Sequence, residues 1–406
     1  MTGSARVGES RPLRPGMDIP LRVESVAFGG AGVGRHEKQA IFVPFTAPDD
    51  EITVTVTEVK KRYARGVIRD IVAASPLRLV PRCPYFTRCG GCAYQHLPYP
   101  LQLEIKTEQL RAVFRRIGNF SDPPVTAIIP SPQAFHYRGK GEFFIRRRRE
   151  GPPAAGFLRR GSHELVEIER CEIVHESIND SLALLRGSES PGTGRREVRK
   201  VTIWSQTGIS PGEFVTRQVL GKILLVPRNG FFQANLYLIP YLIAAVKEMC
   251  DLAGTETVID AYGGSGLFSL FLAPLAGEVT GIEGQAGAAR CARLNLDREG
   301  ITNADFVTGD VGTVLQEMFV RTGRTVDVVL LDPPRTGCEK GVLEATAALR
   351  PPRIVYVSCD PATLARDCRF LAGCGYVLQR LQPLDMFPQT AHIETICLLV
   401  PDGKRK

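Results

Sequence analysis

The sequence predicts an α/β Rossmann-like domain at the carboxyl end, preceded by a β-rich central domain and by a small N-terminal β-barrel of the oligonucleotide-binding (OB) kind. From about Leu236 the pattern alternates strand with helix, which is typical of a doubly wound parallel sheet. Between residues 17 and 77 short runs of alternating hydrophobicity are separated by turn residues, as in small barrels. We therefore expect domains at 16–77, 78–235 and 236–401.

The composition is that of a globular protein with a polyanionic partner. The chain has 406 residues, 44% hydrophobic and 23% charged, which suits two or three domains. No apolar run is long enough to span a membrane and Met1–Arg14 lacks the apolar core of a secretory signal, so we expect a cytoplasmic protein with no membrane partner. In that compartment the eleven cysteines favour metal or catalytic sites over disulfides. The net charge of +8 favours a nucleic acid as partner.

The N-terminal barrel follows an aperiodic segment, residues 1–15, that we expect to be a mobile tail. Its strands are predicted from the runs Leu21–Val23, Ile41–Val43, Ile52–Val56 and Val67–Ile71. Basic residues around Tyr63 either touch RNA or form a solvated face; they are Lys60, Lys61, Arg62 and Arg65. The glycines of Gly30–Gly34 are spaced somewhat like a dinucleotide loop, but no helix-forming segment follows, so we interpret them as a hairpin turn.

The central domain begins with a cysteine cluster. Cys83, Cys89 and Cys92 lie within ten residues, and Cys171 is the best candidate for a fourth ligand. Four thiolates suit either an iron–sulfur cluster or a structural zinc, and the uneven spacing favours [4Fe–4S]. His96 is near enough to compete as a ligand, but we expect it to be a surface residue.

The rest of the central domain is predicted to be one amphipathic helix, residues 101–118, followed by a β-rich stretch to about Arg228. Between residues 138 and 160 eight basic side chains outnumber two acidic ones, and Phe143, Phe144 and Phe157 are interleaved with them. This stretch suits contacts with RNA phosphates and bases, although strand phenylalanines are more often core residues. Gly187–Arg199 is predicted to be a loop.

The strands predicted for the carboxyl-terminal sheet are Thr257–Ala261, Glu278–Ile282, Asp305–Val307, Val326–Leu331, Arg353–Val357 and His392–Val400, with helices such as Gly284–Arg298 and Pro361–Ala372 between them. Cys359 therefore follows a buried strand and precedes a helix, where open α/β sheets place their chemistry. We expect the helix N-terminus to lower the pKa of this thiol and make it a nucleophile. A structural thiol is the alternative.

Three further features line the same edge of the predicted sheet. Asp260–Phe268 is rich in small residues but lacks the G-x-G-x-x-G spacing of nicotinamide sites. Glu283 ends the second strand, where a carboxylate suits a ribose diol. Asp332 ends the fourth strand and is directed into the crevice by the two prolines that follow, unless it simply caps the next helix.

These motifs resemble the RNA uracil-C5 methyltransferase family, which uses S-adenosylmethionine. The resemblance lies in the loop after the first strand, Asp332-Pro-Pro-Arg335, Ser358-Cys-Asp-Pro361, Phe387–Glu394 and Phe231–Asn235, and it extends to the cysteines and to a barrel similar to that family's TRAM domain. It implies that Cys359 is the nucleophile and Glu394 the base that removes the C5 proton. The cofactor-binding residues that it implies are Gln233, Tyr262, Glu283, Asp310 and Asp332. It also implies an iron–sulfur cluster on Cys83, Cys89, Cys92 and Cys171.

Two positions depart from the family pattern. Gly263 stands where a cysteine is common, and Gly139 stands where an asparagine is expected, so any contact of that amide is lost here.

Uracil C5 becomes nucleophilic only after a thiolate adds at C6, and a base must then remove the C5 proton, which explains the need for one cysteine and one carboxylate. Glu394 lies in an apolar strand, so burial should raise its pKa if no cation pairs with it.

The sequence thus predicts a monomeric RNA methyltransferase that forms 5-methyluridine, with 23S ribosomal RNA as the favoured substrate and transfer RNA as the alternative. A non-catalytic RNA-binding module with a vestigial cofactor fold is a second class of function. A DNA or small-molecule methyltransferase is a third, which the barrel and the basic stretch disfavour.

Overall fold

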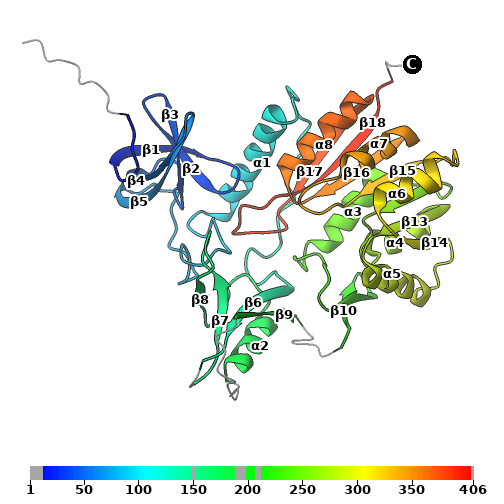
Figure 1. Ribbon diagram of the computed structural model, residues 1–406, viewed down its shortest axis with the longest axis horizontal. Coiled ribbons are helices and arrows are strands. Elements are labelled where there is room, and N and C mark those ends of the chain that lie inside the picture. Colours follow the sequence, from blue (N-terminus) through cyan, green and yellow to red (C-terminus); the bar gives the residue numbers. More distant parts are fainter. Residues whose placement is uncertain (1–11, 149–150, 188–197, 206–211, 404–406) are drawn as a thin grey trace, which may run out of the picture. The chain divides into compact units, whose positions relative to one another are not determined.

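A computed structural model of the chain describes residues 12–148, 151–187, 198–205 and 212–403 (Figure 1). The predicted tail up to residue 11, Arg149 of the basic stretch and residues 188–197 of the predicted loop lie outside the described residues. The chain separates into two compact units. The first contains the residues up to Pro81 together with Ala93–Pro98, and the second contains Arg82–Cys92 and the residues from Tyr99 onward. The finer division at residues 77 and 235 stays a prediction.

The first unit is the predicted barrel. Its five strands close in the order β1-β2-β3-β5-β4. They are β1 (Asp18–Val26), β2 (Ala31–His36), β3 (Gln39–Pro44), β4 (Glu51–Val59) and β5 (Tyr63–Ala73). Side chains alternate between the two faces of each strand, and the inward-facing Val23, Ile41 and Val54 are fully buried.

Two predictions about the first unit were wrong. The hairpin turn spans Ala27–Gly30, where the N–H of Gly30 donates to the carbonyl oxygen of Ala27 at 3.0 Å, and not Gly30–Gly34 as predicted, since the residues from Ala31 onward belong to β2. A Cβ atom on Gly34 would lie 2.3 Å from the carbonyl oxygen of Arg22, so glycine is needed there for close strand approach. His96 is buried with its Nε2 3.1 Å from the carbonyl oxygen of Thr46, because residues 93–98 belong to the barrel unit.

The first helix of the second unit is α1 (Tyr99–Arg116), which confirms the predicted amphipathic helix. A four-stranded sheet of order β8-β7-β6-β9 and the hairpin β10–β11 follow. Their bounds are β6 (Lys140–Arg146), β7 (Ala154–Leu158), β8 (Leu165–Glu167), β9 (Val198–Trp204), β10 (Phe214–Val219) and β11 (Lys222–Pro227). Helix α2 (Glu176–Gly187) interrupts the β-rich stretch and was not predicted. Phe143 is fully buried, which confirms the core interpretation of that residue.

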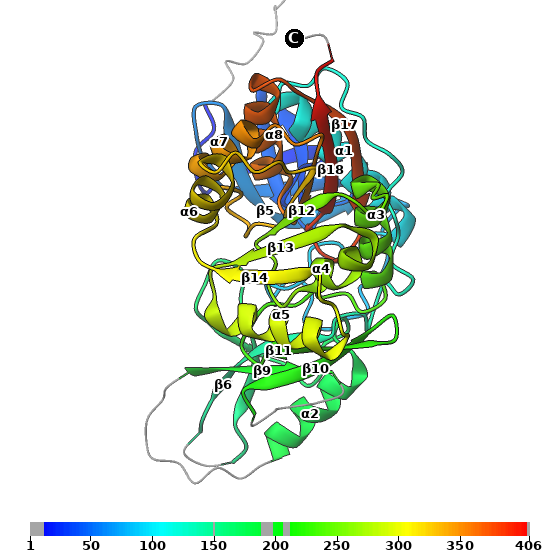
Figure 2. The same ribbon diagram turned by 90° about the vertical axis from the view of Figure 1, so that its right-hand side faces the viewer.

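The carboxyl-terminal part contains a seven-stranded sheet of order β14-β13-β12-β15-β16-β18-β17 (Figure 2). The first five strands are parallel, whereas β18 and β17 pair antiparallel. They are β12 (Thr257–Ala261), β13 (Glu278–Glu283), β14 (Ala304–Thr308), β15 (Val328–Leu331), β16 (Arg353–Ser358), β17 (Tyr376–Leu384) and β18 (Glu394–Pro401). The six predicted strands are confirmed, β12 with the predicted bounds and the others with shifted ends, and β17 was missed.

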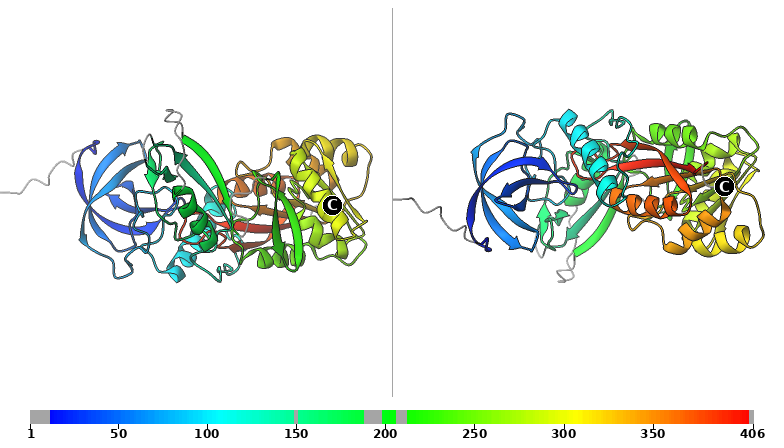
Figure 3. Two further views of the ribbon diagram at one scale, coloured as in Figure 1. Left: turned by 90° about the horizontal axis from the view of Figure 1, so that it is seen from below. Right: turned by 90° about the horizontal axis from the view of Figure 1, so that it is seen from above.

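Helices cover both faces of this sheet (Figure 3). They are α3 (Ile239–Cys250), α4 (Leu267–Leu272), α5 (Ala286–Arg298), α6 (Val311–Val314), α7 (Lys340–Leu349) and α8 (Pro361–Gly373), with short η1 (Ala273–Leu275) and π-helical η2 (Leu315–Val320). Helix α1 packs against α8. The Rossmann-like α/β fold is therefore confirmed, and the carboxyl ends of its parallel strands form one edge. Within the described residues, no helix combines the length and the apolar character needed to cross a membrane.

Candidate active site

The predicted nucleophile and the predicted base lie on neighbouring strands. Strand β16 ends at Ser358, which pairs with Thr395 of β18 in an antiparallel register. Continuing this register by one residue places Cys359 opposite Glu394. Side chains at opposed positions of paired strands lie on the same face of the sheet. The β16–β18 pairing therefore brings together a thiol and a carboxyl group that are 35 residues apart in the sequence.

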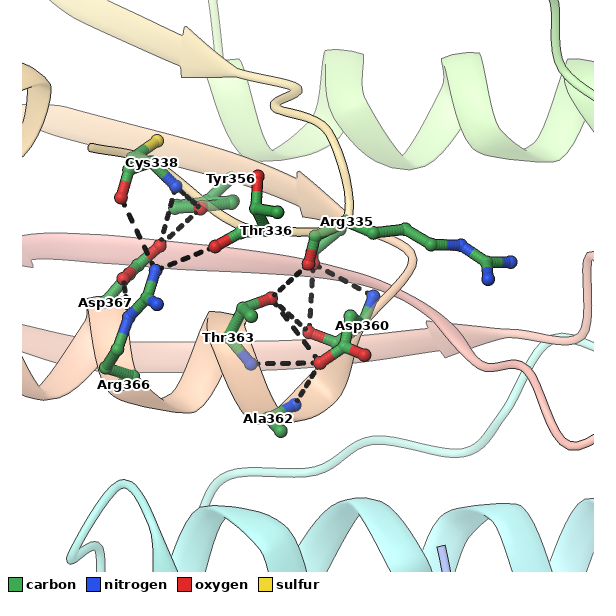
Figure 4. Close-up of polar contacts among 10 residues, drawn as sticks. Arg335, Thr336, Cys338, Tyr356, Asp360, Ala362, Thr363, Arg366 and Asp367 are labelled. Atoms are coloured by element: carbon green, nitrogen blue, oxygen red, sulfur yellow. Dashed lines mark hydrogen bonds and ion pairs between the residues drawn. The ribbon is translucent and has the colours of Figure 1, made fainter. Parts of the chain in front are cut away.

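The surroundings of Cys359 raise the pKa of its thiol to about 11, because the side chain is largely buried and the carboxyl groups of Glu394 and Asp332 are close. The guanidinium group of Arg335 acts in the opposite direction. The prediction of a lowered thiol pKa was wrong. The helix N-terminus is already capped by Asp360, whose carboxylate accepts the backbone N–H groups of Ala362 at 2.9 Å and Thr363 at 3.0 Å (Figure 4).

Glu394 is 3% exposed, and burial raises the pKa of its carboxyl group well above the usual value. The nearby Asp332 raises this pKa further, and Arg335 opposes the rise. This confirms the effect expected from burial in an apolar strand. The pKa of Asp332 is itself raised to about 8, first by burial and then by Asp260. The site thus favours protonated carboxyl groups when no further positive charge is present.

Arg335 also belongs to this site, although the motif Asp332-Pro-Pro-Arg335 did not predict a catalytic or binding role for it. It lies in the exposed turn after β15, and its Nη2 is 3.3 Å from the Nε2 of His392. The pKa of His392 is lowered to about 4 by burial and by neighbouring cations, Arg335 first among them, so this ring is neutral near pH 7. The signal for Arg335 was its place three residues after Asp332 in one motif.

Four of the five predicted cofactor-binding residues follow neighbouring strands. Tyr262, Glu283, Asp310 and Asp332 come at or just after the ends of β12, β13, β14 and β15. Tyr262 has the left-handed φ of +63°, which bends the chain sharply after β12. The fifth, Gln233, is buried in the segment between β11 and α3, and within the described part of the chain it shares no hydrogen bond with the other four.

Carboxylates hold the turn after β12 at the edge of the sheet. Glu283 accepts the backbone N–H of Gly264 at 3.0 Å, so the ends of β12 and β13 are joined. Asp310 caps α6 by accepting the N–H of Thr313 at 2.8 Å. A Cβ atom on Gly263 would lie 2.8 Å from Cε1 of Phe306, so this departure from the family pattern matches the space available.

At the second departure, Gly139, neighbouring side chains occupy the space that an asparagine side chain would need. A Cβ atom there would lie 2.8 Å from Nη2 of Arg217 and 2.5 Å from Cδ2 of Leu236. Arg217 is 3% exposed and donates to the carbonyl oxygen of Ser205 at 2.9 Å. An asparagine at this position would displace the arginine, so the change to glycine accompanies a different local packing.

The segment before Glu394 is held by residues that precede the sheet in sequence. Lys106 of α1 donates to Asp385 at 2.5 Å, and both side chains are fully buried. Gln102 of α1 exchanges two hydrogen bonds of 3.0 Å with Gln389. The hydroxyl of Tyr137 donates to the carbonyl oxygen of Pro388 at 3.0 Å. The direction in which the chain enters β18 therefore depends on α1 and Tyr137.

The four predicted metal ligands do not form a metal site as they lie. Cys89 is close enough to Cys83 and to Cys171 for the thiols to influence one another's pKa, and burial raises the pKa of all three. Within residues 12–403, excluding the gaps noted above, no group of three or more His, Cys, Asp or Glu side chains has an arrangement that could hold a metal ion. The structure therefore does not support the predicted [4Fe–4S] cluster.

The raised thiol pKa predicts how Cys359 reacts with an alkylating reagent. Because the thiolate is the reactive form, the rate of iodoacetamide labelling should rise about ten-fold per pH unit between pH 7 and 9. Peptide mass spectrometry of timed samples measures labelling at this residue, with the exposed Cys374 as internal reference. A labelling rate that is already constant at pH 8 would contradict the raised pKa.

Comparison with known proteins extends the resemblance over the chain. A family model described as tRNA (Uracil-5-)-methyltransferase matches residues 221–401, and a TRAM-domain model matches residues 12–68. A protein of Thermosynechococcus vestitus named an uncharacterized RNA methyltransferase is 32% identical over 95% of this chain and 98% of its own length. One from Bacillus cereus with the same name is 33% identical over 96% of this chain and 97% of its own.

A solved structure shares the fold of nearly the whole chain. The Pyrococcus abyssi tRNA (uracil-54, C5)-methyltransferase, in complex with S-adenosyl-L-homocysteine, is 27% identical with a TM-score of 0.68. The match covers 94% of this chain and 100% of that one. It includes both the barrel and the sheet that carries Cys359 and Glu394.

Proposed function

The chain belongs to the RNA uracil-C5 methyltransferase family and is an S-adenosylmethionine-dependent RNA methyltransferase, and from that premise we propose that it methylates C5 of a specific uridine through a covalent bond between Cys359 and C6. The observation that supports this proposal is the β16–β18 register, which sets Cys359 opposite Glu394. Asp332 and Arg335 are close to both. A nucleophile, a base and a cation are thus gathered at one edge of the sheet, as this reaction requires.

In the proposed reaction the Cys359 thiolate adds to C6, and the electron pair of the 5,6 double bond moves toward C5. Arg335 stabilises the thiolate, which the raised pKa otherwise disfavours. S-adenosylmethionine, when bound, supplies the methyl group as an electrophilic sulfonium that C5 attacks. Glu394 then takes the C5 proton, and the thiolate leaves as the double bond re-forms. The raised carboxyl pKa suits a group that must accept a proton from carbon.

The residues at the strand ends would hold the cofactor. Glu283 is half-buried, and its carboxylate, which accepts the backbone N–H groups of Gly264 and Gln285, would accept the ribose diol with its remaining lone pairs. Asp310 lies one strand further along, beside the proposed adenine position. Tyr262 and the glycines after it let the ligand approach the backbone. We assign Gln233 and Asp332 to the same ligand because they match the family's positions. Equilibrium dialysis tests this assignment by comparing the affinity of the wild-type chain for S-adenosylmethionine with that of the Glu283→Gln variant.

We propose that part of the substrate RNA lies in a groove on the central sheet. The groove has a volume of about 610 Å³ and is formed by Gly90, Gly91 and the residues from Phe157 to His163. Its cationic side chains, Arg159 and Arg160, come from the basic stretch that the sequence singled out. Phe157 adds an aromatic ring that is only half-buried. Basic groups suit phosphates, and an aromatic ring suits an unstacked base.

Replacing both Arg159 and Arg160 by Ala should weaken RNA binding about ten-fold at 0.1 M salt and flatten its salt dependence, because two phosphate contacts are lost. Filter binding of radiolabelled RNA over a salt series measures both effects. Arg321→Ala with Arg324→Ala removes the same charge from two arginines outside the groove, each of which forms a salt bridge, as Arg159 does with Glu164. An equal loss in this control would assign the effect to net charge, and the groove proposal would be wrong.

We propose 23S ribosomal RNA as the substrate, with transfer RNA as the alternative that the name of the Pyrococcus abyssi relative favours. Both substrates place the enzyme in the cytoplasm, where we expect a monomer. Nucleoside mass spectrometry of ribosomal and transfer RNA from a strain that lacks the gene tests the target. Loss of 5-methyluridine from ribosomal RNA supports the first substrate, whereas loss from transfer RNA alone supports the second. No loss from either RNA would refute both.

The [4Fe–4S] cluster on Cys83, Cys89, Cys92 and Cys171 stays a prediction from sequence, and no step of the proposed reaction depends on it. Anaerobically purified protein that is brown and contains about four iron atoms per chain would support it. Colourless protein that contains one zinc would replace it with a structural zinc site.

A further inference from the structure

Backbone groups of residues 335, 336 and 338, in the turn that carries Arg335, contact side chains of helix α8 (Figure 4). The hydroxyl group of Thr363 lies 3.2 Å from the carbonyl oxygen of Arg335 and 3.1 Å from that of Asp360, so its one proton is shared between these two acceptors. Arg366 donates through Nη2 to the carbonyl oxygen of Thr336 at 3.1 Å. The backbone N–H of Cys338 donates to Oδ2 of Asp367 at 3.0 Å. Residues 363, 366 and 367 lie on one side of the helix, since positions three and four apart are neighbours.

Asp367 is the centre of these contacts. It is 1% exposed, and Oδ2 also accepts the hydroxyl of Tyr356 at 2.7 Å. Its Oδ1 accepts Nε of Arg366 at 2.8 Å. One buried carboxylate therefore orients the arginine that holds Thr336 and binds the turn itself at Cys338. A buried, hydrogen-bonded carboxylate of this kind fixes geometry because every alternative leaves a polar group without a partner.

The fit between turn and helix is close. Gly337 has a left-handed φ of +75°, and a Cβ atom there would lie 2.6 Å from both Nη2 of Arg366 and Oδ2 of Asp367. A side chain at this position would push the turn away from the helix. The side chain of Arg335 extends away from these contacts, as Figure 4 shows.

The same helix also begins next to Cys359. Its cap, Asp360, accepts the N–H of Thr363, whose hydroxyl group lies between the carbonyl oxygens of Asp360 and Arg335. The position of the thiol and the position of Arg335 are therefore both set by α8. The thiol of Cys338 in addition interacts with the hydroxyl of Tyr262 in the proposed cofactor loop.

We propose that Asp367 is a positioning residue for methyl transfer, which holds the 335–338 turn on α8 so that the guanidinium group of Arg335 faces Cys359 and Glu394. This inference rests on the roles proposed above for those two residues. Asp367 itself touches neither substrate nor cofactor, so its effect on the reaction passes through Arg335. Loss of the carboxylate leaves the turn free to move, and a displacement of about 1 Å at a reacting group lowers rates by up to about a hundred-fold.

The test is a double-mutant cycle of Asp367→Asn and Arg335→Ala. The substrate is total RNA from the strain that lacks the gene, the cofactor carries a radiolabelled methyl group, and the rate is measured in a single turnover with excess enzyme. We expect a ten- to hundred-fold loss in each single variant and no further loss in the double variant. Factors that multiply in the double variant would overturn the proposal.

The pH profile separates positioning from general loss of structure. When Arg335 is displaced, the Cys359 thiolate loses its stabilising cation. The rising limb of the pH–rate profile, where the methyl-transfer rate increases with pH, should therefore move to higher pH in Asp367→Asn and in Arg335→Ala alike. Asp50→Asn is the matched control, because Asp50 is fully buried and pairs with Arg78 in the barrel. That control should leave the limb in place. A fall by one factor at every pH in Asp367→Asn would contradict the proposal.

Thr363→Val keeps the test decisive if Asp367→Asn does not fold. It removes the hydroxyl that links the carbonyl groups of Arg335 and Asp360 and leaves the backbone cap of α8 intact. The limb should move in the same direction by a smaller amount, and an unmoved limb would overturn the proposal. Failure of the proposed function gives a different result, since wild-type enzyme would then put no methyl group on the uridines of this RNA.

Discussion

Cys359→Ala should lower methyl transfer by at least about 10⁴-fold, because no other group of the site can saturate the 5,6 double bond of the uracil ring. Binding of the RNA and the cofactor should stay within about two-fold, since alanine removes only a sulfur atom. Transfer of a radiolabelled methyl group to RNA measures the rate. RNA that contains 5-fluorouridine adds a second readout: the fluorine cannot leave as a proton, so the wild-type enzyme should be trapped as a covalent complex.

Cys374→Ala is the matched control, because this exposed cysteine follows the other end of α8. It should retain full activity and form the trapped complex. Methylation by Cys359→Ala at the wild-type rate would rule out the covalent mechanism. A wild-type chain that forms no trapped complex with any RNA would instead favour the non-catalytic RNA-binding module.

Glu394→Gln should lower the turnover number by about 10²- to 10⁴-fold for a different reason, since the amide cannot accept the C5 proton. Addition and methyl transfer come before that step, so this variant should accumulate methylated RNA bound covalently to the protein. Denaturing gel electrophoresis of reactions with unmodified RNA detects such a complex. The raised pKa also has a consequence: activity should fall as the pH drops through a value well above 4.5, where the carboxyl group becomes protonated.

Glu248→Gln is the matched control, since Glu248 is an exposed glutamate that pairs with Arg380. Its turnover should be unchanged. If Glu394→Gln releases methylated RNA at the wild-type rate, another group must remove the proton, and the assignment of the base is wrong.

The strand pattern and the motif spacing were enough to predict most of the α/β fold. Parallel strands such as β12 and β16 are short apolar runs that lie between helices, so their period and flanking residues identify them. Strand β17 was missed because Gln379, Arg380 and Gln382 interrupt its apolar pattern. It forms because β18 supplies a partner, and such tertiary pairing is invisible in a local window.

The electrostatics of the site could not be predicted from the sequence in the same way. A helix N-terminus next to Cys359 suggested a low thiol pKa, but Asp360 uses those N–H groups and burial acts in the opposite direction. The carboxyl group of Glu394 and the guanidinium of Arg335 are distant in sequence, and their effect depends on how strands pair. Residue types were therefore predictable from motifs, whereas protonation states required the folded arrangement.

The contacts of α1 with the chain before β18 limit how this enzyme could be shortened or exchanged between proteins. The family model for the catalytic part begins at residue 221, yet Lys106, Gln102 and Tyr137 all precede it. A fragment that starts there would remove Lys106, the cation that pairs with Asp385, and would expose the face of α8 that α1 covers. The catalytic sheet is thus not a self-sufficient module, and a chimera that borrows it must also inherit this helix.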